Sequence, residues 1–256
     1  MRIQLEQMLA KLNGIEENVD ALSKRVEAQD KFSKAIEEEN LDRKITLYTA
    51  AIELDPDYAH AFNNRGNAYN KKGKYDRAIA DYDRAIELAP DNADAFNSRG
   101  IAYTELGKYD RAIADYDRAI ELDPDHADAF NNRGFAYGNK GEYDRAIANY
   151  DRAIELDPDD ALALNNKAWL LAAAGDPQVR DGQEAVRLAR ESVHLGDAPE
   201  YRDTLAAAYA EAGQFDDAIA EQERAMEMLR EAGRHNEIAD FQTRLNLYRS
   251  HQPYRQ

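Results

Sequence analysis

The sequence predicts an all-α protein: an alpha-solenoid of antiparallel helix pairs, preceded by a helix with a heptad pattern. The first observation is a 34-residue internal repeat, marked by proline at Pro56, Pro90, Pro124 and Pro158. The second is near-copied text, because residues 77–88 reappear unchanged as 111–122 and again as 145–156 with Asn149 as the one change. Repeats of this length stack on one another, since a single unit cannot bury its apolar face alone.

Each unit is expected to contain two helices. In the clearest unit the first helix is predicted over residues 59–72 and ends at Gly73, because glycine readily adopts the left-handed conformation that closes a helix. The second is predicted over residues 75–88 and stops before Pro90, whose ring cannot continue it. Small residues such as Gly66 would let the two helices approach closely, and aromatics such as Tyr82 would fill the spaces between pairs.

These positions resemble the tetratricopeptide repeat (TPR) family. In the unit 59–92 the matching residues are Gly66, Tyr69, Ala78, Tyr82, Ala85 and Pro90, and their counterparts recur in units 93–126 and 127–160. Phe62 stands where the family often has Trp, and Arg65 where Leu is common. The resemblance implies an open right-handed superhelix whose concave groove receives partner proteins.

The remaining segments are assigned around these three units. Residues 25–58 are predicted to form a degenerate repeat that lacks glycine at its first turn. Residues 161–198 form a divergent repeat with a long loop over 176–182, and residues 199–232 form a second divergent repeat. Residues 235–250 have one apolar face and are expected to be a capping helix, which a solenoid needs at its end.

Residues 1–29 carry an a/d heptad pattern over about three heptads, near the minimum for a coiled coil. The apolar positions are Leu5, Met8, Leu12, Ile15, Val19, Leu22 and Val26. This pattern is typical of an oligomerisation helix. It is equally typical of an amphipathic helix that lies against the first repeat and covers its apolar face, so both interpretations stay open.

The resemblance also implies that the first helix of each pair lines the concave groove. It places a row of amides there: Asn63, Asn64, Asn67, Asn97, Asn131, Asn132, Asn165 and Asn166, interrupted by Ser98. An amide side chain offers donors and an acceptor, so such a row could hold an extended peptide by its backbone. The alternative is that these side chains only solvate the groove or bond within the solenoid.

One groove position changes from polar to apolar along the chain. It is occupied in successive units by Asn67, Ile101, Phe135 and Trp169. Exposed aromatic side chains in a concave surface are good anchors for a partner. The alternative is that the chain's own C-terminal helix, or the loop after Gly175, covers Phe135 and Trp169.

Two specialised activities are not expected. Some relatives clamp a C-terminal carboxylate, but the basic positions of that clamp correspond to Asn63, Asp128 and Asn132 here, and only Asn67 is retained. The sequence shows no phosphate-binding glycine loop, nucleophile motif or metal-ligand spacing, so neither an enzyme nor a cofactor or metal site is predicted. Asp81 is expected to form a solvated ion pair with Arg77, one helical turn away.

The amino-acid composition indicates which classes of molecule the protein is expected to bind. The chain has 33 basic and 50 acidic residues among 256, a formal charge of −17, which disfavours nucleic acids and anionic lipid surfaces and favours neutral or basic polypeptides. It has no cysteine, and its longest apolar run, residues 168–174, is too short to span a bilayer. A cytoplasmic location is therefore expected.

The sequence supports two functional hypotheses. In the first, the protein is a protein–protein interaction scaffold that binds an extended peptide segment in its groove. In the second, it is a self-assembling structural protein, built through the N-terminal heptads or by end-to-end stacking of repeats into oligomers or filaments. A groove filled by a foreign peptide would favour the first, and a groove filled by a neighbouring copy the second.

Overall fold

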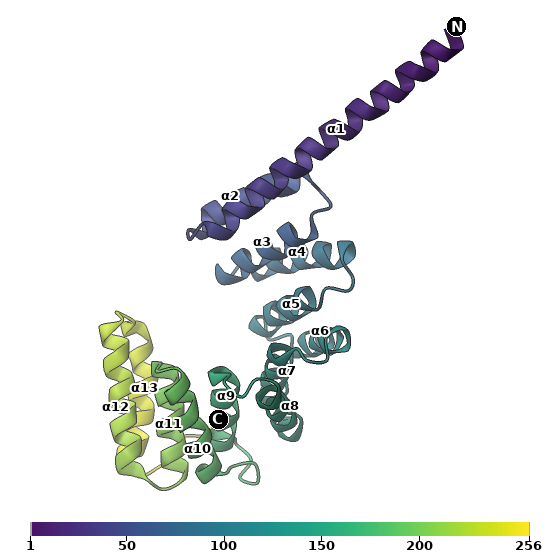
Figure 1. Ribbon diagram of the computed structural model, residues 1–256. Helices are drawn as coiled ribbons and strands as arrows, with labels where there is room; N and C mark the ends of the chain where they lie inside the picture. Colours follow the sequence, from purple (N-terminus) through teal and green to yellow (C-terminus); the bar gives the residue numbers. More distant parts are fainter. Residues whose placement is uncertain (1, 256) are drawn as a thin grey trace. The chain divides into compact units, whose positions relative to one another are not determined.

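The computed structural model describes the backbone of residues 2–255, and the side chains of residue 8 and residues 11–255. Throughout this part of the chain the regular structure is helical, which confirms the predicted all-α class (Figure 1). The elements, in chain order, are α1 (Arg2–Glu37), α2 (Leu41–Leu54), α3 (Ala59–Lys71), α4 (Tyr75–Leu88), α5 (Ala93–Glu105), α6 (Tyr109–Leu122), α7 (Ala127–Asn139), α8 (Tyr143–Leu156), α9 (Ala161–Ala173), α10 (Gly182–Leu195), α11 (Pro199–Glu211), α12 (Phe215–Glu231), the 3-10 turn η1 (His235–Glu237) and α13 (Ile238–Arg249).

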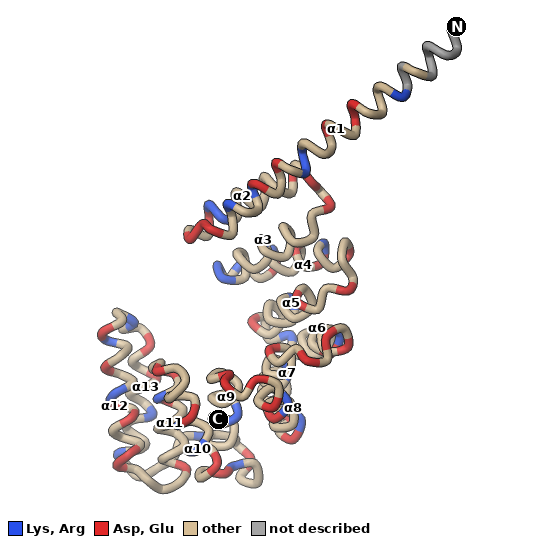
Figure 2. The backbone as a smooth tube through the Cα atoms, viewed as in Figure 1, with Lys and Arg blue, Asp and Glu red and all other residues tan. Residues whose placement is uncertain are grey.

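The chain divides into two compact units, Met1–Leu122 with α1 to α6 and Asp123–Gln256 with α7 to α13. Within each unit a helix packs mainly against its neighbours in sequence, as in α3 with α4 or α11 with α12. Acidic and basic positions are interspersed along α1 and along the helices of both units (Figure 2). Local packing of successive pairs is the arrangement expected of a repeat solenoid.

Glycine and tyrosine set the distance between the two helices of a pair. A Cβ atom added at Gly100 would lie 2.5 Å from Cε1 of Tyr116, whose side chain is almost fully buried. The equivalent distance from Gly66 to Tyr82 is 2.6 Å. Gly73 has φ of 67°, the left-handed conformation predicted for the end of the helix. The small positions therefore let the two helices approach as predicted, whereas the tyrosines pack within a pair as well as toward the next one, since Tyr82 clusters with Ala102 of α5.

One predicted ion pair is wrong. Asp81 is buried and accepts hydrogen bonds from Arg65, at 2.8 Å from Nε and 2.7 Å from Nη2, rather than pairing with Arg77. Arg77 lies instead over the ring of Tyr69, 5.7 Å from its centroid. The hydrogen bonds with Asp81 raise the pKa of the Arg65 guanidinium, so this guanidinium stays charged between the helices. This contact explains arginine at the position where the family commonly has leucine.

The first unit begins with a continuous helix. The second half of α1 pairs with α2, and Ala28 and Ala51 are fully buried at their contact with Ala61 of α3. Phe32 packs on the ring of Tyr58, with centroids 4.9 Å apart. The first half of α1 extends beyond α2 without a break (Figure 1). The heptad segment and the first helix of the degenerate repeat are thus parts of one helix.

The heptad positions of α1 are exposed. Leu5 lies outside the residues whose side chains are described. The other six are 55–66% exposed: Met8, Leu12, Ile15, Val19, Leu22 and Val26. These six side chains do not cover the first repeat, which removes the capping interpretation for them, whereas self-association stays a prediction.

The second unit has the larger core. Leu164, Leu188 and Tyr209 are buried among α9, α10 and α11, and the ring of Tyr248 from α13 is fully buried in the same cluster. Residues 174–181 connect α9 to α10, and Arg180 holds this loop by donating to the carbonyl oxygen of Ala174 at 2.8 Å. None of the described helices is both long and apolar enough to cross a membrane.

Candidate functional site

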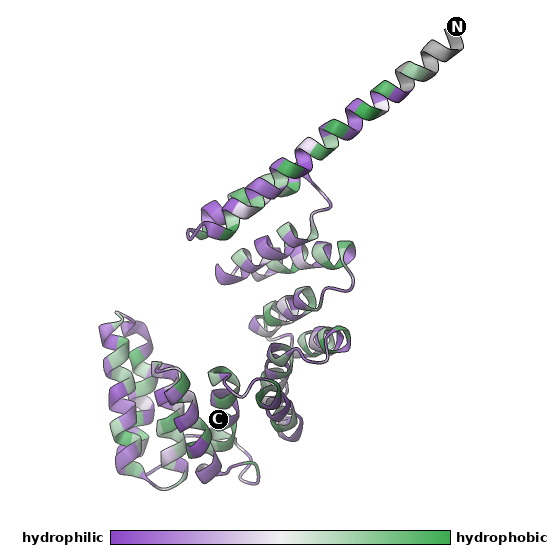
Figure 3. Cartoon of the chain, viewed as in Figure 1, coloured by the Kyte–Doolittle hydropathy of each residue, from purple (hydrophilic) through white to green (hydrophobic). Residues whose placement is uncertain are grey.

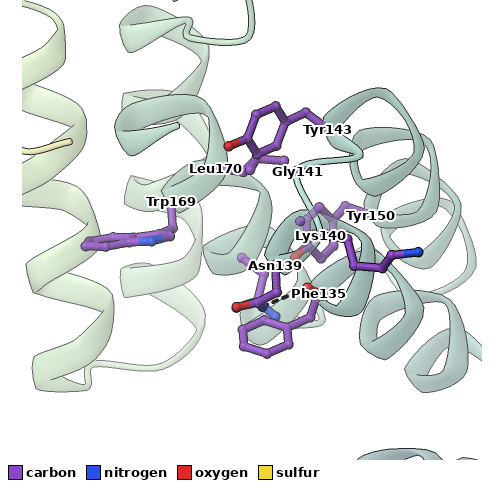
Figure 4. Close-up of a pocket in the computed structure, with 10 residues that line it drawn as sticks. Phe135, Asn139, Lys140, Gly141, Tyr143, Tyr150, Trp169 and Leu170 are labelled. Carbon is purple, nitrogen blue, oxygen red and sulfur yellow. Dashed lines mark hydrogen bonds between the residues drawn. The ribbon is translucent and has the colours of Figure 1, made fainter. Parts of the chain in front are cut away.

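The candidate site is a cavity in the second unit, between the facing sides of α7 and α9. It has a volume of about 560 Å³, and α8 closes one side of it with Tyr143 and Tyr150. The aromatic side chains of Phe135 and Trp169 project from their separate helices, with Asn139 beside Phe135 (Figure 4). These aromatic and amide groups come from the first helices of two successive repeats, the helices that the family resemblance assigned to the groove.

The two aromatic side chains differ in how they are covered. Phe135 is 44% exposed, which is unusual for a phenylalanine in a folded protein. Trp169 is half-buried, because the ring of Tyr254 packs against it with centroids 5.7 Å apart and the guanidinium of Arg244 lies 5.8 Å from its centroid. The chain's own C-terminal segment therefore covers part of Trp169, as one of the two predicted alternatives had it, and leaves Phe135 open.

Several contacts hold that C-terminal segment in place. Arg255 lies 2.5 Å from a carboxylate oxygen of Glu211 and donates to the carbonyl oxygen of Ala172 at 3.5 Å. Arg244 donates to the buried carboxylate of Asp203 at 2.7 Å while packing on Trp169 and Tyr254. The segment is held against α9, α11 and α13 by these charged contacts, by aromatic packing and by the contact of Tyr254 with the core of the unit.

Two amides border the aromatic cavity. Asn139 donates from Nδ2 to the backbone oxygen of Phe135 at 2.9 Å, a bond within α7. Asn166 donates from Nδ2 to Oδ1 of Asn131 at 3.0 Å, which links α9 to α7. This bond uses one of the two N–H groups of the Asn166 amide, and its carbonyl oxygen could accept a backbone N–H from a ligand.

The predicted asparagine row separates into two kinds of residue. The first asparagine of each repeat is at most 9% exposed: Asn63, Asn97, Asn131 and Asn165. The second position, occupied by Asn64, Ser98, Asn132 and Asn166, is half-buried. Asn67 is also half-buried and accepts a hydrogen bond from the hydroxyl of Tyr82 at 2.7 Å. Asn67, Asn131 and Asn166 thus bond within the solenoid, and the second position of each repeat is more exposed to a ligand than the first.

The first unit has a smaller cavity that the sequence did not predict as a whole. It measures about 330 Å³ and contains Asn64 and Asn67 from α3 together with Lys44 from α2 and Lys71. Lys44 belongs to a second helix, outside the groove positions that the resemblance implies, so only its placement in space reveals it, whereas Lys71 lies on the groove-lining helix α3. Ile101, the apolar position in this unit, is half-buried on α5.

The charged groups near the aromatic cavity are paired. Lys140 and Arg145 both lie 2.8 Å from carboxylate oxygens of Glu142, and the hydrogen bond from Lys140 lowers the pKa of Glu142. Burial raises the pKa of the Tyr150 hydroxyl, so this group stays protonated. Among the described residues, no cluster of three or more His, Asp or Glu side chains is placed to hold a metal ion. The chemistry that the cavity offers is aromatic packing and amide hydrogen bonding.

Comparisons with known proteins agree with this architecture. Models of the TPR repeat match residues 66–107 and 100–141, and models of the tetratricopeptide repeat match residues 47–80, 127–160, 149–178 and 200–232. A comparison with curated proteins found no match.

Two solved tetratricopeptide repeat structures share the fold of this chain. A tetratricopeptide repeat protein from Parabacteroides merdae is 22% identical, with 79% of this chain and 78% of that chain covered and a TM-score of 0.63. TTC0263, a thermophilic TPR protein in Thermus thermophilus, is 20% identical, with 75% and 98% covered and a TM-score of 0.60. The first TPR of Spaghetti (RPAP3), bound to an HSP90 peptide, is 33% identical over 42% of this chain and 85% of that chain, with a TM-score of 0.41. From the family models that match along its length, the chain belongs to the tetratricopeptide repeat family.

Proposed function

We propose that this protein is an interaction scaffold whose second unit binds an extended segment of a partner protein between α7 and α9. Membership of a family of interaction modules supports the general role. The observation that carries the specific site is Phe135, 44% exposed at the edge of a cavity of about 560 Å³ that Trp169 also lines. Exposed aromatic side chains next to a concave surface are typical anchors at protein interfaces.

The lining suggests how such a segment would bind. An apolar side chain of the partner would enter the cavity between Phe135 and Trp169 and bury apolar area on both rings. The amides of Asn139 and Asn166, with Asn132 nearby on α7, would bond the peptide backbone and so would not read its sequence. Because the chain carries a net charge of −17, the partner segment is expected to be neutral or basic around its apolar anchor.

The test uses the chain's single tryptophan, Trp169, as a reporter within the cavity. Unstructured peptides would be selected on the intact protein from a display library, and the enriched peptides titrated while tryptophan emission is recorded. We expect enrichment of sequences with one apolar anchor and neutral or basic flanks, and a change in emission on binding. Phe135→Ala should weaken binding about tenfold, equivalent to about 1.4 kcal/mol.

Leu162→Ala is the matched control. Leu162 is 47% exposed on α9, the same helix as Trp169, but does not line the cavity. Its removal should leave affinity unchanged. If peptides bind without changing Trp169 emission, or if Phe135→Ala and Leu162→Ala behave alike, the site between α7 and α9 is not the binding site.

A further inference from the structure

The first half of α1 carries a long apolar stripe that no other part of the described chain covers. Six large apolar side chains, Met8, Leu12, Ile15, Val19, Leu22 and Val26, are each 55–66% exposed. Apolar residues recur along the projecting part of the helix (Figure 3). Exposing this much apolar surface on one helix is unfavourable in water and marks a surface that a partner covers.

The stripe points away from the rest of the first unit. α1 packs against α2 and α3 through Ala28 and Phe32, and Ala35 is fully buried on the same side of the helix. Val26 comes two residues before Ala28, so at 3.6 residues per turn the two lie about 160° apart around the helix axis. A second helix can therefore cover the stripe without displacing α2.

We propose that the α1 helices of two copies of this chain form a parallel, in-register, two-stranded coiled coil along this stripe. Leu12, Val19 and Val26 take the a positions, and Met8, Ile15 and Leu22 the d positions. Valine at a with leucine at d, as in Val19, Leu22 and Val26, favours two strands, whereas Leu12 at a with Ile15 at d favours a larger number, so the choice of two strands rests on the Val19–Val26 heptad.

The charges that flank the stripe select the parallel orientation. Lys11 and Arg25 occupy g positions, and Glu16 and Asp30 occupy e positions. In a parallel dimer each g residue meets the e residue five positions later in the other helix, which pairs Lys11 with Glu16 of the partner subunit and Arg25 with Asp30 of the partner subunit. An antiparallel dimer brings g to g and e to e, and so places basic residues against basic ones and acidic against acidic.

The flanking charges remain accessible in the single chain. The side chain of Arg25 is 70% exposed, and its Nε atom lies 3.9 Å from a carboxylate oxygen of Asp55. Asp30 lies 2.6 Å from Lys34 in an exposed pair one turn along the same helix. Exposed pairs of this kind contribute little, so they can be exchanged for contacts across the dimer. The dimer would give one particle two copies of the cavity between α7 and α9, which increases the avidity for a partner with two binding segments.

Disulfide trapping tests the orientation directly, because the chain has no cysteine. Met8→Cys and Val26→Cys would be made singly in the full chain and equilibrated in a glutathione redox buffer. In a parallel, in-register dimer each variant should link to itself and give a covalent species of twice 29.0 kDa. Glu17→Cys, at the f position on the outer face, should not. An antiparallel dimer would instead link the two variants to each other and neither to itself, which would overturn the proposal.

The mass in solution tests the stripe itself. Sedimentation of the wild-type chain should give twice 29.0 kDa, and Ile15→Asp with Leu22→Asp should give 29.0 kDa with an unchanged thermal midpoint of the solenoid, since both side chains are exposed. A wild-type monomer, a trimer or a tetramer would refute the proposal, as would a dimer that the double variant leaves intact. None of these outcomes bears on the cavity site, which lies in the other unit.

Charge exchange provides an independent test. Lys11→Glu with Arg25→Glu makes both flanks acidic, and Glu16→Lys with Asp30→Lys makes both flanks basic, so each variant alone should lose the dimer. Mixing the two variants should restore it. Retention of the dimer by each variant alone would contradict the parallel pairing.

Discussion

Gly66, Gly100 and Gly134 each lie against a buried tyrosine ring of the following helix. Gly100→Ala should destabilise the protein by about 2 kcal/mol, because the added methyl group would overlap Tyr116, whose buried ring cannot move aside. This loss outweighs the gain of about 1 kcal/mol that alanine brings to a helix interior. Chemical denaturation measures the difference. Gly14→Ala is the control, since nothing lies within 4 Å of a Cβ atom there, and it should increase helicity without loss of stability.

The buried pair of Arg65 and Asp81 gives a second prediction for single residues. Arg65→Leu leaves the Asp81 carboxylate buried without its partner and should reduce the free energy of unfolding by about 3 kcal/mol. Arg65→Leu with Asp81→Ala removes both charges and should recover most of that loss. Denaturant unfolding of the four proteins of this double-mutant cycle measures the coupling between the two side chains.

The repeat over residues 127–160 provides the matched control for this cycle. There Arg133 donates to Oδ1 of Asn149, a neutral amide, at 2.7 Å. Arg133→Leu should therefore cost less than Arg65→Leu. Equal losses would show that the packing of arginine on the neighbouring phenylalanine rings, Phe62 and Phe130, matters more than the buried charge.

Some of these residue contacts could be predicted from the sequence and others could not. Gly66, Gly73 and Tyr82 were interpreted correctly because their roles follow from size and backbone freedom alone. Asp81 was assigned to Arg77 because both lie on one helix, whereas its true partner lies on the preceding helix, 16 residues away. The signal was present, since an arginine and an acid or amide recur 16 residues apart in three successive repeats, but only packing shows that this spacing is a contact.

At the scale of elements, the C-terminal segment determines how much of Trp169 is open. Tyr254→Ala should increase the accessibility of Trp169 to a collisional quencher such as acrylamide, because the ring that packs on it is removed. If the segment and a peptide occupy overlapping surface, the same substitution should also raise peptide affinity. Gln252→Ala, an exposed residue of the same segment, is the control and should change neither quantity.

Arg244 also packs on Trp169 and could limit its quenching without Tyr254. Unchanged quenching in Tyr254→Ala would mean that Arg244, which lies 5.8 Å from the centroid of Trp169, covers the indole by itself. Arg244→Ala could then be compared directly. It would also leave the buried carboxylate of Asp203 with fewer donors, and would therefore lower stability as well.

Element boundaries were predictable where the sequence carries a stop signal. Glycine and proline bracket the helix pairs of the clear repeats, and α4 covers residues 75–88 as predicted. The junction between the heptad segment and the degenerate repeat carries no such signal. The sequence therefore suggested two overlapping segments, whereas α1 is one helix from Arg2 to Glu37 whose described buried positions begin at Ala28.

At the scale of the whole molecule, the repeat was enough to identify the family, but it could not predict how exposed the two aromatic side chains of the site are. Phe135 and Trp169 occupy equivalent positions in successive repeats, and their spacing predicts equal exposure. Their different exposure follows from Tyr254, which is 85 residues away from Trp169 in the sequence and reaches it only through the packing of α13. Contacts of this kind depend on tertiary structure that a local pattern does not contain.

The near-identity of the repeats leads to a prediction for the whole chain. α4 and α6 have the same sequence, and α5 and α7 both begin with Ala-Asp-Ala-Phe. Deleting residues 93–126 therefore joins Asn92 to Ala127, so that α7 follows a helix with the same sequence as α6. Because a solenoid is stabilised by contacts between neighbouring repeats, the shortened chain should fold, with a lower thermal midpoint and a denaturant m-value reduced by roughly an eighth.

Deleting residues 93–109 is the control for that experiment. It removes α5 and joins the turn after α4 directly to α6, so two second helices follow one another without a first helix between them. Circular dichroism should show loss of cooperative unfolding in this variant and its retention after the full-repeat deletion. If the full-repeat deletion also unfolds or aggregates, the stability of the chain depends on a property of residues 93–126 that their copies do not share. Arg99 would then be the first side chain to test. It contacts two carboxylates, Asp83 and Asp115, whereas Arg65 contacts one carboxylate, Asp81, and the hydroxyl of Thr49.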